Sequence, residues 1–116
     1  MIKLVILIEP PEDNEQFMTA WPNFLRLAEE MPGLQEEATS QVDHLLYGNN
    51  SYVMMHELFF NTMTDATLAM SSSIGQAAGE MLQNISGGKL VLFFADYKQD
   101  SIENIRKYKK QTDQAG

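Results

Sequence analysis

Two histidines, His44 and His56, are the side chains of this sequence that titrate near neutral pH in their ordinary state. His56 alternates with Met54 and Leu58 along an apolar run, so we expect it to face a helix layer. There it would serve as a general base or a ligand anchor. The alternative is a neutral histidine that bonds to a backbone carbonyl inside an apolar core. His44 lies in a more polar stretch, where we expect exposure to solvent.

Aromatic and methionine side chains supply the apolar surroundings of such a histidine. Eight methionines in 116 residues favour an adaptable pocket, because thioethers repack around irregular shapes. An ordinary hydrophobic core is the alternative interpretation of the same side chains. The predicted pocket residues are Trp21, Phe24, Tyr52, Met54 and Met81.

Glu57 follows His56 directly and therefore points to the opposite face of a strand. Lys3, on another predicted strand, can reach that same face, so we predict a Lys3–Glu57 ion pair in preference to a catalytic carboxylate. The alternation also keeps His56 and Glu57 from joining Asp43 and His44 around one metal ion, and we predict no metal site. The chain contains no cysteine, which excludes thiolate metal sites and cysteine nucleophiles, and we expect no cofactor.

The strands that must position these residues follow from the hydrophobic pattern. Residues 2–8 and 89–97 are apolar on both faces, which predicts strands buried on both sides. Residues 35–47 are more polar and predict an edge strand. A turn at 48–51, rich in Gly and Asn, should lead into a returning strand over 52–60.

Apolar residues at helical spacing predict a first helix that includes residues 17–31. Pro22 lies inside this pattern and should kink the helix or restart it, because proline removes a backbone donor. Residues 61–70 predict a turn with a short helical piece. The helix and the strands on either side of it place Trp21 and Phe24 opposite His56.

A second long helix begins at a capping box formed by Ser73 and Gln76 and ends at residues 86–88. Gly75 and Gly79 are four residues apart on this helix. They indicate close helix packing rather than phosphate binding, since a phosphate-binding loop needs a different spacing.

The element order β-α-β-β-α-β predicts an α+β, ferredoxin-like fold: an antiparallel four-stranded sheet with two helices on one face. Two helices cover one face only, yet three strands are apolar on both faces. A second copy that packs its sheet against the uncovered face would bury this surface, so we predict a homodimer.

The charge is unevenly distributed, which bears on partners. The net charge is −8 overall, with −10 over residues 1–97 and +2 over 98–116. This acidity argues against nucleic acid as a partner, because phosphates require an excess of Lys and Arg. The sequence contains no apolar run of membrane-spanning length, and we expect no membrane partner and a cytoplasmic location.

Residues 1–98 are expected to form the domain, and residues 99–116 a basic tail that is partly helical or disordered. The tail carries apolar side chains among its bases. It could be a solvated helix, or an arm that lies across the acidic body of a partner subunit through Ile102, Ile105 and Tyr108.

Four segments occur in a familiar order: IKLVIL at 2–7, MPGL at 31–34, SSSIGQAAG at 71–79 and GGKLVLFFAD at 87–96. Together, over residues 2–98, they resemble the EthD family, which is named after ethyl tert-butyl ether degradation. The resemblance implies a dimeric α+β barrel. It also implies kinship with cofactor-independent monooxygenases, isomerases and polyketide cyclases, in which the ligand lies between helices and sheet.

The chain departs from that family at one position. Members commonly carry a histidine in the first helix, where this sequence has Phe24. The resemblance implies a homodimer that binds a small apolar, oxygenated organic molecule in catabolic or secondary metabolism, and the missing histidine leaves catalysis open. The alternative is a non-catalytic structural or partner-binding subunit.

Overall fold

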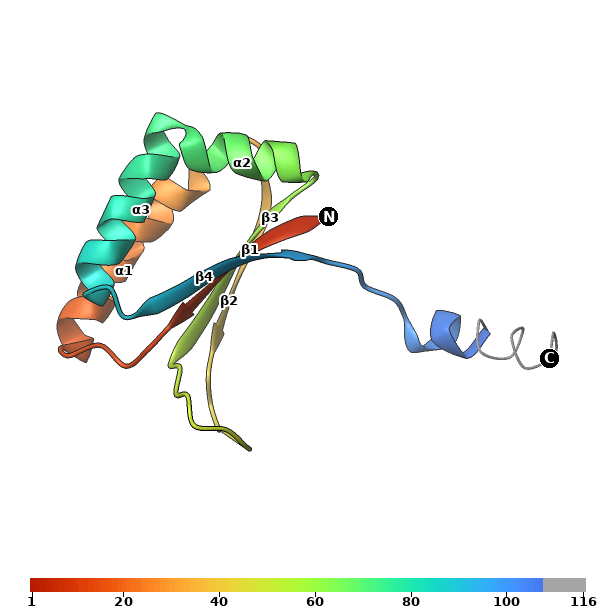
Figure 1. Cartoon of the computed structure of the whole chain (residues 1–116), viewed down its shortest axis with the longest axis horizontal. Helices are drawn as coiled ribbons and strands as arrows, with labels where there is room; N and C mark the ends of the chain where they lie inside the picture. The colour runs from red at the N-terminus through yellow and green to blue at the C-terminus, as the bar shows by residue number, and fades with distance from the viewer. Residues whose placement is uncertain (108–116) are drawn as a thin grey trace.

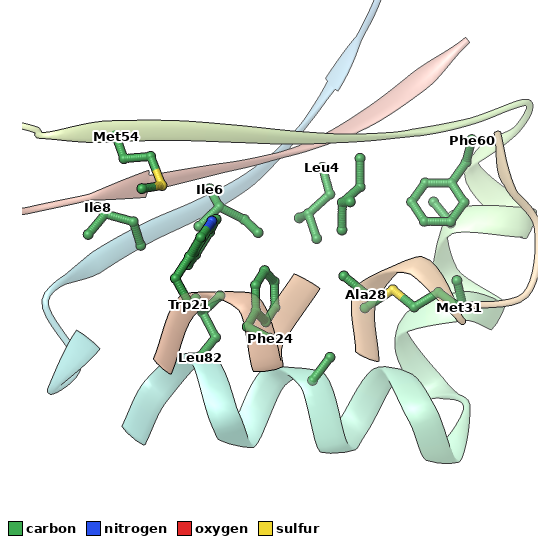
Figure 2. Packing of buried hydrophobic residues seen from close by; sticks show 14 of the residues in the cluster. Leu4, Ile6, Ile8, Trp21, Phe24, Ala28, Met31, Met54, Phe60 and Leu82 are labelled. Atoms are coloured by element: carbon green, nitrogen blue, oxygen red, sulfur yellow. The ribbon is translucent and has the colours of Figure 1, made fainter. Parts of the chain in front are cut away.

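The computed structural model of the chain describes residues 1–107 (Figure 1). The strands form one antiparallel sheet in the order β2-β3-β1-β4, with helices on one side of it (Figures 1 and 2). The predicted α+β, ferredoxin-like fold is therefore confirmed. The elements in chain order are β1 (Ile2–Ile8), α1 (Asn14–Glu29), β2 (Leu34–Gln41), β3 (Met54–Phe60), α2 (Met63–Ser71), α3 (Ser73–Ser86) and β4 (Leu90–Asp96).

β1 lies between β3 and β4 and fixes which residues share a face. Ile6 of β1 lies opposite His56 on β3 and Leu92 on β4. These three side chains share one face of the sheet, the helix side, because directly paired residues of neighbouring strands point the same way. The next residue along each strand points to the other face. Glu57 and Phe93 therefore point to the other side of the sheet, as predicted for Glu57.

A register shift between Leu34 and Glu36 changes which residues of β2 face the helices. Leu34 pairs with a residue on the helix side of β3. Beyond the shift, Glu37 and Thr39 also pair with residues on that side, and Thr39 lies directly opposite His56. The extra residue thus brings two polar side chains to the helix side of an edge strand.

The second and third strands pair antiparallel as predicted, but the predicted tight turn between them and the predicted strand ends are wrong. A strand is expected to reach residue 47 and turn at 48–51, but β2 ends at Gln41 and residues 42–53 form an irregular, mostly exposed connection. The reason is the length of the central strand. Since β1 ends at Ile8, a longer β2–β3 ribbon would pair only with itself, and an isolated two-stranded ribbon is marginally stable.

α1 starts after Asp13, whose carboxylate accepts a hydrogen bond from the Gln16 backbone N–H at 3.0 Å. The helix continues through Pro22 and does not restart there. Its apolar side packs against the sheet, and Leu82 of α3 reaches the same layer from below (Figure 2). The buried residues of α1 are Phe17, Trp21, Phe24 and Ala28.

The predicted short helical piece after the third strand is a full helix, α2, and it displaces the start of α3. Ser72, not Ser73, caps α3 by accepting a hydrogen bond from the Gly75 N–H at 3.1 Å. Gln76 donates its side-chain N–H to the Ser71 carbonyl oxygen. Because α2 runs to Ser71, only one extended residue separates the helices, and that residue takes the cap.

The helices leave β4 largely uncovered. Leu92 and Phe94 on the helix side are 43% and 41% exposed, and Phe93 on the opposite side is 43% exposed. The sheet surface away from the helices bears no described helix or strand, and we call it the open face. Its larger apolar residues are Val5, Leu7, Met55, Phe59, Val91 and Phe93.

The chain leaves the sheet after β4. Residues 102–107 are helical and lie well away from the domain (Figure 1). Ile102 and Ile105 are exposed there. Tyr108, the third residue expected in a contact with a partner, lies outside the described residues. Among residues 1–107, no helix has the length and apolar character needed to cross a membrane.

Candidate functional site

His56 lies at the middle of β3, under α1, with no solvent-exposed surface. Its Nδ1 is 2.8 Å from the Thr39 hydroxyl oxygen, and the tautomer of the ring decides which atom donates the hydrogen bond. Its Nε2 lies 3.3 Å from Oε2 of Glu37 but is not aligned for a hydrogen bond. A buried imidazole nitrogen is thus left without a hydrogen-bond partner in the part of the chain that the structure describes.

Two aromatic rings of α1 cover the imidazole. The Trp21 and His56 ring centroids are 5.3 Å apart with an interplanar angle of 89°, and the Phe24 and His56 centroids are 6.1 Å apart at 76°. These edge-to-face arrangements are the ones that aromatic quadrupoles favour. Trp21 and Phe24 point from α1 toward the sheet (Figure 2). The cover that α1 provides over His56 is therefore aromatic and apolar.

Burial lowers the pKa of His56 from 6.5 to about 4, against the charges of Glu57 and Glu29, which act in the opposite direction. Burial raises the pKa of Glu37 from 4.5 to about 7, and a side-chain hydrogen bond with Glu29 and the charge of Glu29 add to this rise. At neutral pH the imidazole is consequently neutral, while Glu37 is protonated for part of the time. The pair can accept and release a proton, which is the requirement for acid–base chemistry.

The structure places the five predicted pocket residues at different distances from the core. Trp21, Phe24 and Met54 lie in the same buried cluster (Figure 2), and the rings of Trp21 and Phe24 lie close to the His56 ring. Met81, on α3, is partly buried and packs against that cluster. Tyr52 lies in the irregular connection before β3 and is half-buried.

A recess of about 480 Å³ opens near this cluster, between the start of α1 and the end of α3. Phe17 lies in its wall, and the Phe17 and Trp21 ring centroids are 5.6 Å apart. The Phe17 ring thus lies between the recess and Trp21, and the Trp21 ring in turn lies against His56. Its rim is polar and includes Glu12, Asp13 and Lys89.

The predicted Lys3–Glu57 ion pair is confirmed. Lys3 Nζ lies 2.5 Å from Glu57 Oε2 on the open face. Lys3 also lies over the Tyr97 ring, 5.2 Å from its centroid. Glu57 is therefore paired on the opposite side of the sheet from His56. His44 is exposed, as expected, but lies in the irregular connection.

Sequence reasoning missed Glu37, Thr39 and Glu29. Glu37 and Thr39 share a face with His56 only because of the register shift in β2. Their spacing of two residues shows that Glu37 and Thr39 share a face of the strand. Only the pairing with β3 shows that this face is the one that carries His56. Within residues 1–107, no group of three or more His, Asp or Glu side chains could hold a metal ion.

No protein-family model matches the sequence, and no curated protein matches it. Solved structures do match. An EthD (ethyl tert-butyl ether degradation) family protein from Bacillus halodurans C-125 is similar with a TM-score of 0.78 and 25% identity, over 84% of this chain and 99% of that chain. The resemblance that the sequence motifs indicated is confirmed by this structure.

Two more distant structures share the fold. A dimeric ferredoxin-like protein of unknown function from Jannaschia sp. CCS1 has a TM-score of 0.64 and 18% identity, covering 83% of this chain and 98% of that chain. SnoaB, a cofactor-independent oxygenase from Streptomyces nogalater, has a TM-score of 0.63 and 12% identity, covering 87% and 96%. At these identities the likeness shows the architecture alone.

Proposed function

We propose that this chain is an EthD-like homodimeric protein that binds a small apolar, oxygenated organic molecule between α1 and the sheet. His56 acts on that molecule as an acid–base group, without a cofactor. The observation that carries the proposal is the buried imidazole with an unpartnered Nε2, enclosed by Trp21 and Phe24. An uncompensated buried polar atom costs about 1–3 kcal/mol, so a polar group of a ligand bonded to Nε2 would recover that cost.

The route to this position starts at the recess beside α1. A ligand in the recess would meet Phe17 first and, after rotation of that ring, Trp21 and His56. The recess itself is lined largely by polar residues, whereas Phe17 and Trp21 beyond it are aromatic, and this combination favours an apolar ligand with one or two oxygens. A cofactor-independent oxygenase from Streptomyces nogalater has the same architecture, so the fold is compatible with chemistry of this kind.

The proposal of a homodimer rests on the open face. The face carries Phe93, 43% exposed, and Val91, 39% exposed, and a second sheet would cover them. The Jannaschia protein with the same fold is described as dimeric. The tail, with exposed Ile102 and Ile105 and a positive charge, would lie across the acidic body of the partner.

Trp21 is the single tryptophan, so its fluorescence reports directly on ligand binding. We expect saturable changes when a panel of small ethers, phenols and aromatic ketones is titrated into the protein. The variant His56→Ala should weaken the binding of the responding compounds, because the ligand loses its hydrogen-bond partner. His44→Ala is the matched control, since His44 is exposed in the connection 42–53, and should bind as the wild type does.

Mass spectrometry of the responding compounds after incubation with the protein tests for turnover. A product that forms with the wild type and not with His56→Ala supports catalysis. A fluorescence that stays constant across the whole panel argues against the pocket, and the non-catalytic, partner-binding alternative then becomes the better account.

A further inference from the structure

The His56 imidazole has no contact with solvent, and every proton that it gains or loses must pass through a neighbouring group. Trp21 and Phe24 cover it from α1, and the buried Ile6 lies beside it on β1. These three side chains cannot carry a proton. The polar side-chain atoms that approach the ring come from β2.

Glu37 spans the distance between the buried ring and the surface. Its Oε2 lies 3.3 Å from Nε2 of His56, yet its side chain is 29% exposed. Glu29, the last residue of α1, is exposed, and its hydrogen bonding and charge help to raise the pKa of Glu37. Glu37 therefore reaches the imidazole while part of its side chain stays in contact with solvent.

We propose that Glu37 is the residue through which His56 exchanges protons with solvent, and that Thr39 decides which ring nitrogen carries the proton. This inference deepens the proposed function, because it gives the acid–base group of that site a route for its proton. Glu37 and Thr39 are positioning residues here: each acts through His56.

The proposed path moves one proton between water, the Glu37 carboxyl group and Nε2 of His56. In the resting state that we propose, Nδ1–H donates to the Thr39 hydroxyl oxygen, 2.8 Å away, and Nε2 directs its lone pair toward Glu37. The protonated carboxyl of Glu37 transfers its proton to Nε2, which yields an imidazolium and a carboxylate. Water at the exposed part of Glu37 then returns a proton to the carboxylate, and the reverse steps release the proton from the ring.

The charges around the ring are consistent with this path. Glu29 acts on Glu37 from the C-terminal end of α1, where the helix dipole also disfavours a negative charge and so favours a shared proton. Glu57, on β3 itself, points away from the helix side and is neutralised by Lys3 of β1. Glu37 is the charged group that lies next to Nε2 among the described residues.

Nitrogen-15 NMR of the histidine rings tests the inference without any ligand. Wild-type His56 should show the neutral Nδ1–H tautomer, and Thr39→Val should change the tautomer ratio. Near the pKa of His56, about 4, where the imidazolium is populated, Glu37→Gln should slow the exchange of the Nε2 proton with water by about a hundredfold, the usual effect of removing a positioned acid–base group.

Glu36→Gln is the matched control: it removes the same charge from the neighbouring residue, which pairs opposite Phe59 on the open-face side. Its exchange should equal that of the wild type. An unchanged rate in Glu37→Gln, or equal slowing in both variants, would overturn the proposal. If no compound alters Trp21 fluorescence while Glu37→Gln still slows exchange, the proposed function fails and the proton path stands.

Discussion

The pKa of His56 is lowered and the pKa of Glu37 is raised, although the two side chains lie 3.3 Å apart. The pKa of His56 falls to about 4 in the native protein, so the stability that depends on its neutral form is complete above pH 6.5 and is lost as the pH falls toward 4. The pKa of Glu37 rises to about 7, so its contribution is complete below pH 4.5 and is lost as the pH rises through 7. Between pH 4.5 and 6.5 the two contributions oppose each other.

We expect His56→Gln to flatten the acid side of the stability curve. The full effect of the His56 shift is about 3 kcal/mol in the free energy of unfolding, since one pKa unit corresponds to about 1.4 kcal/mol. Urea unfolding at a fixed protein concentration between pH 4 and 8, followed by Trp21 fluorescence, measures it. His44→Gln should keep the wild-type slope; an equal flattening in both variants would contradict the assignment to His56.

Between pH 5 and 8 the same measurement tests Glu37. Glu37→Gln should gain stability relative to the wild type as the pH rises from 5 to 8, because the variant has no carboxylate to ionise beside Glu29. Glu36→Gln should show no such pH-dependent gain. A constant difference between Glu37→Gln and the wild type at all pH values would show that Glu37 ionises normally.

At the scale of elements, Gly75 of α3 lies closer to its neighbours, the backbone of α2, than any other described glycine does. A Cβ on Gly75 would lie 2.0 Å from the backbone oxygen of Ala69 and 3.0 Å from that of Met70. Both atoms belong to the backbone of α2, which cannot yield without moving the helix. Gly79, on the same helix, has no atom within 4 Å of the corresponding position.

Gly75→Ala should therefore lower the free energy of unfolding by at least about 1–3 kcal/mol, the usual cost of overpacking. Gly79→Ala should raise it by about 0.5–1 kcal/mol, because alanine favours the helix and meets no neighbour. Thermal unfolding of both variants measures the pair. Equal effects of the two substitutions would show that α2 and α3 do not approach each other as closely as described.

The hydrophobic pattern was sufficient for elements buried on both faces and failed where pairing depends on distant strands. β1 matches the predicted range, and β4 is one residue shorter than predicted at each end. The connection 42–53 has local strand character, but β1 is too short to support an extension. His56, Trp21 and Phe24 could be predicted to lie together, because the hydrophobic pattern alone shows which side of the strand and of the helix each residue occupies.

Glu37 and Thr39 could not be predicted as neighbours of His56. Their side depends on the register shift between Leu34 and Glu36, and one inserted residue reverses the face of every later residue in the strand. Nothing in the local composition of β2 marks that shift. The acid–base partners of the site depend on strand pairing, which the sequence of β2 does not reveal. The positions of the imidazole and of the aromatic rings that cover it follow from the hydrophobic periodicity.

At the scale of the whole molecule, adjacent residues of β4 allow a direct test of the dimer. Phe93 and Phe94 are 43% and 41% exposed but point to opposite faces of the sheet. Phe93→Ser should produce a monomer at micromolar concentration, because it removes apolar area from the open face. Phe94→Ser removes the same area from the helix side and should leave a dimer.

Light scattering coupled to size-exclusion chromatography distinguishes these states. A wild-type protein that is monomeric at micromolar concentration would refute the sheet-to-sheet dimer. Dissociation by both variants alike would place the interface elsewhere on β4.

The exposed β4 also has a colloidal consequence. Residues 90–95 are six consecutive apolar residues without a charge or a proline, and no described strand pairs with the outer edge of β4. Segments of this kind recruit further strands and nucleate cross-β fibrils when they are left open. A partner sheet would shield the side chains of this segment, so dilution below the dimer dissociation constant would promote fibril formation even in fully folded chains. The time for which the protein stays in solution without forming fibrils would then be limited by the affinity of the dimer rather than by the stability of the fold.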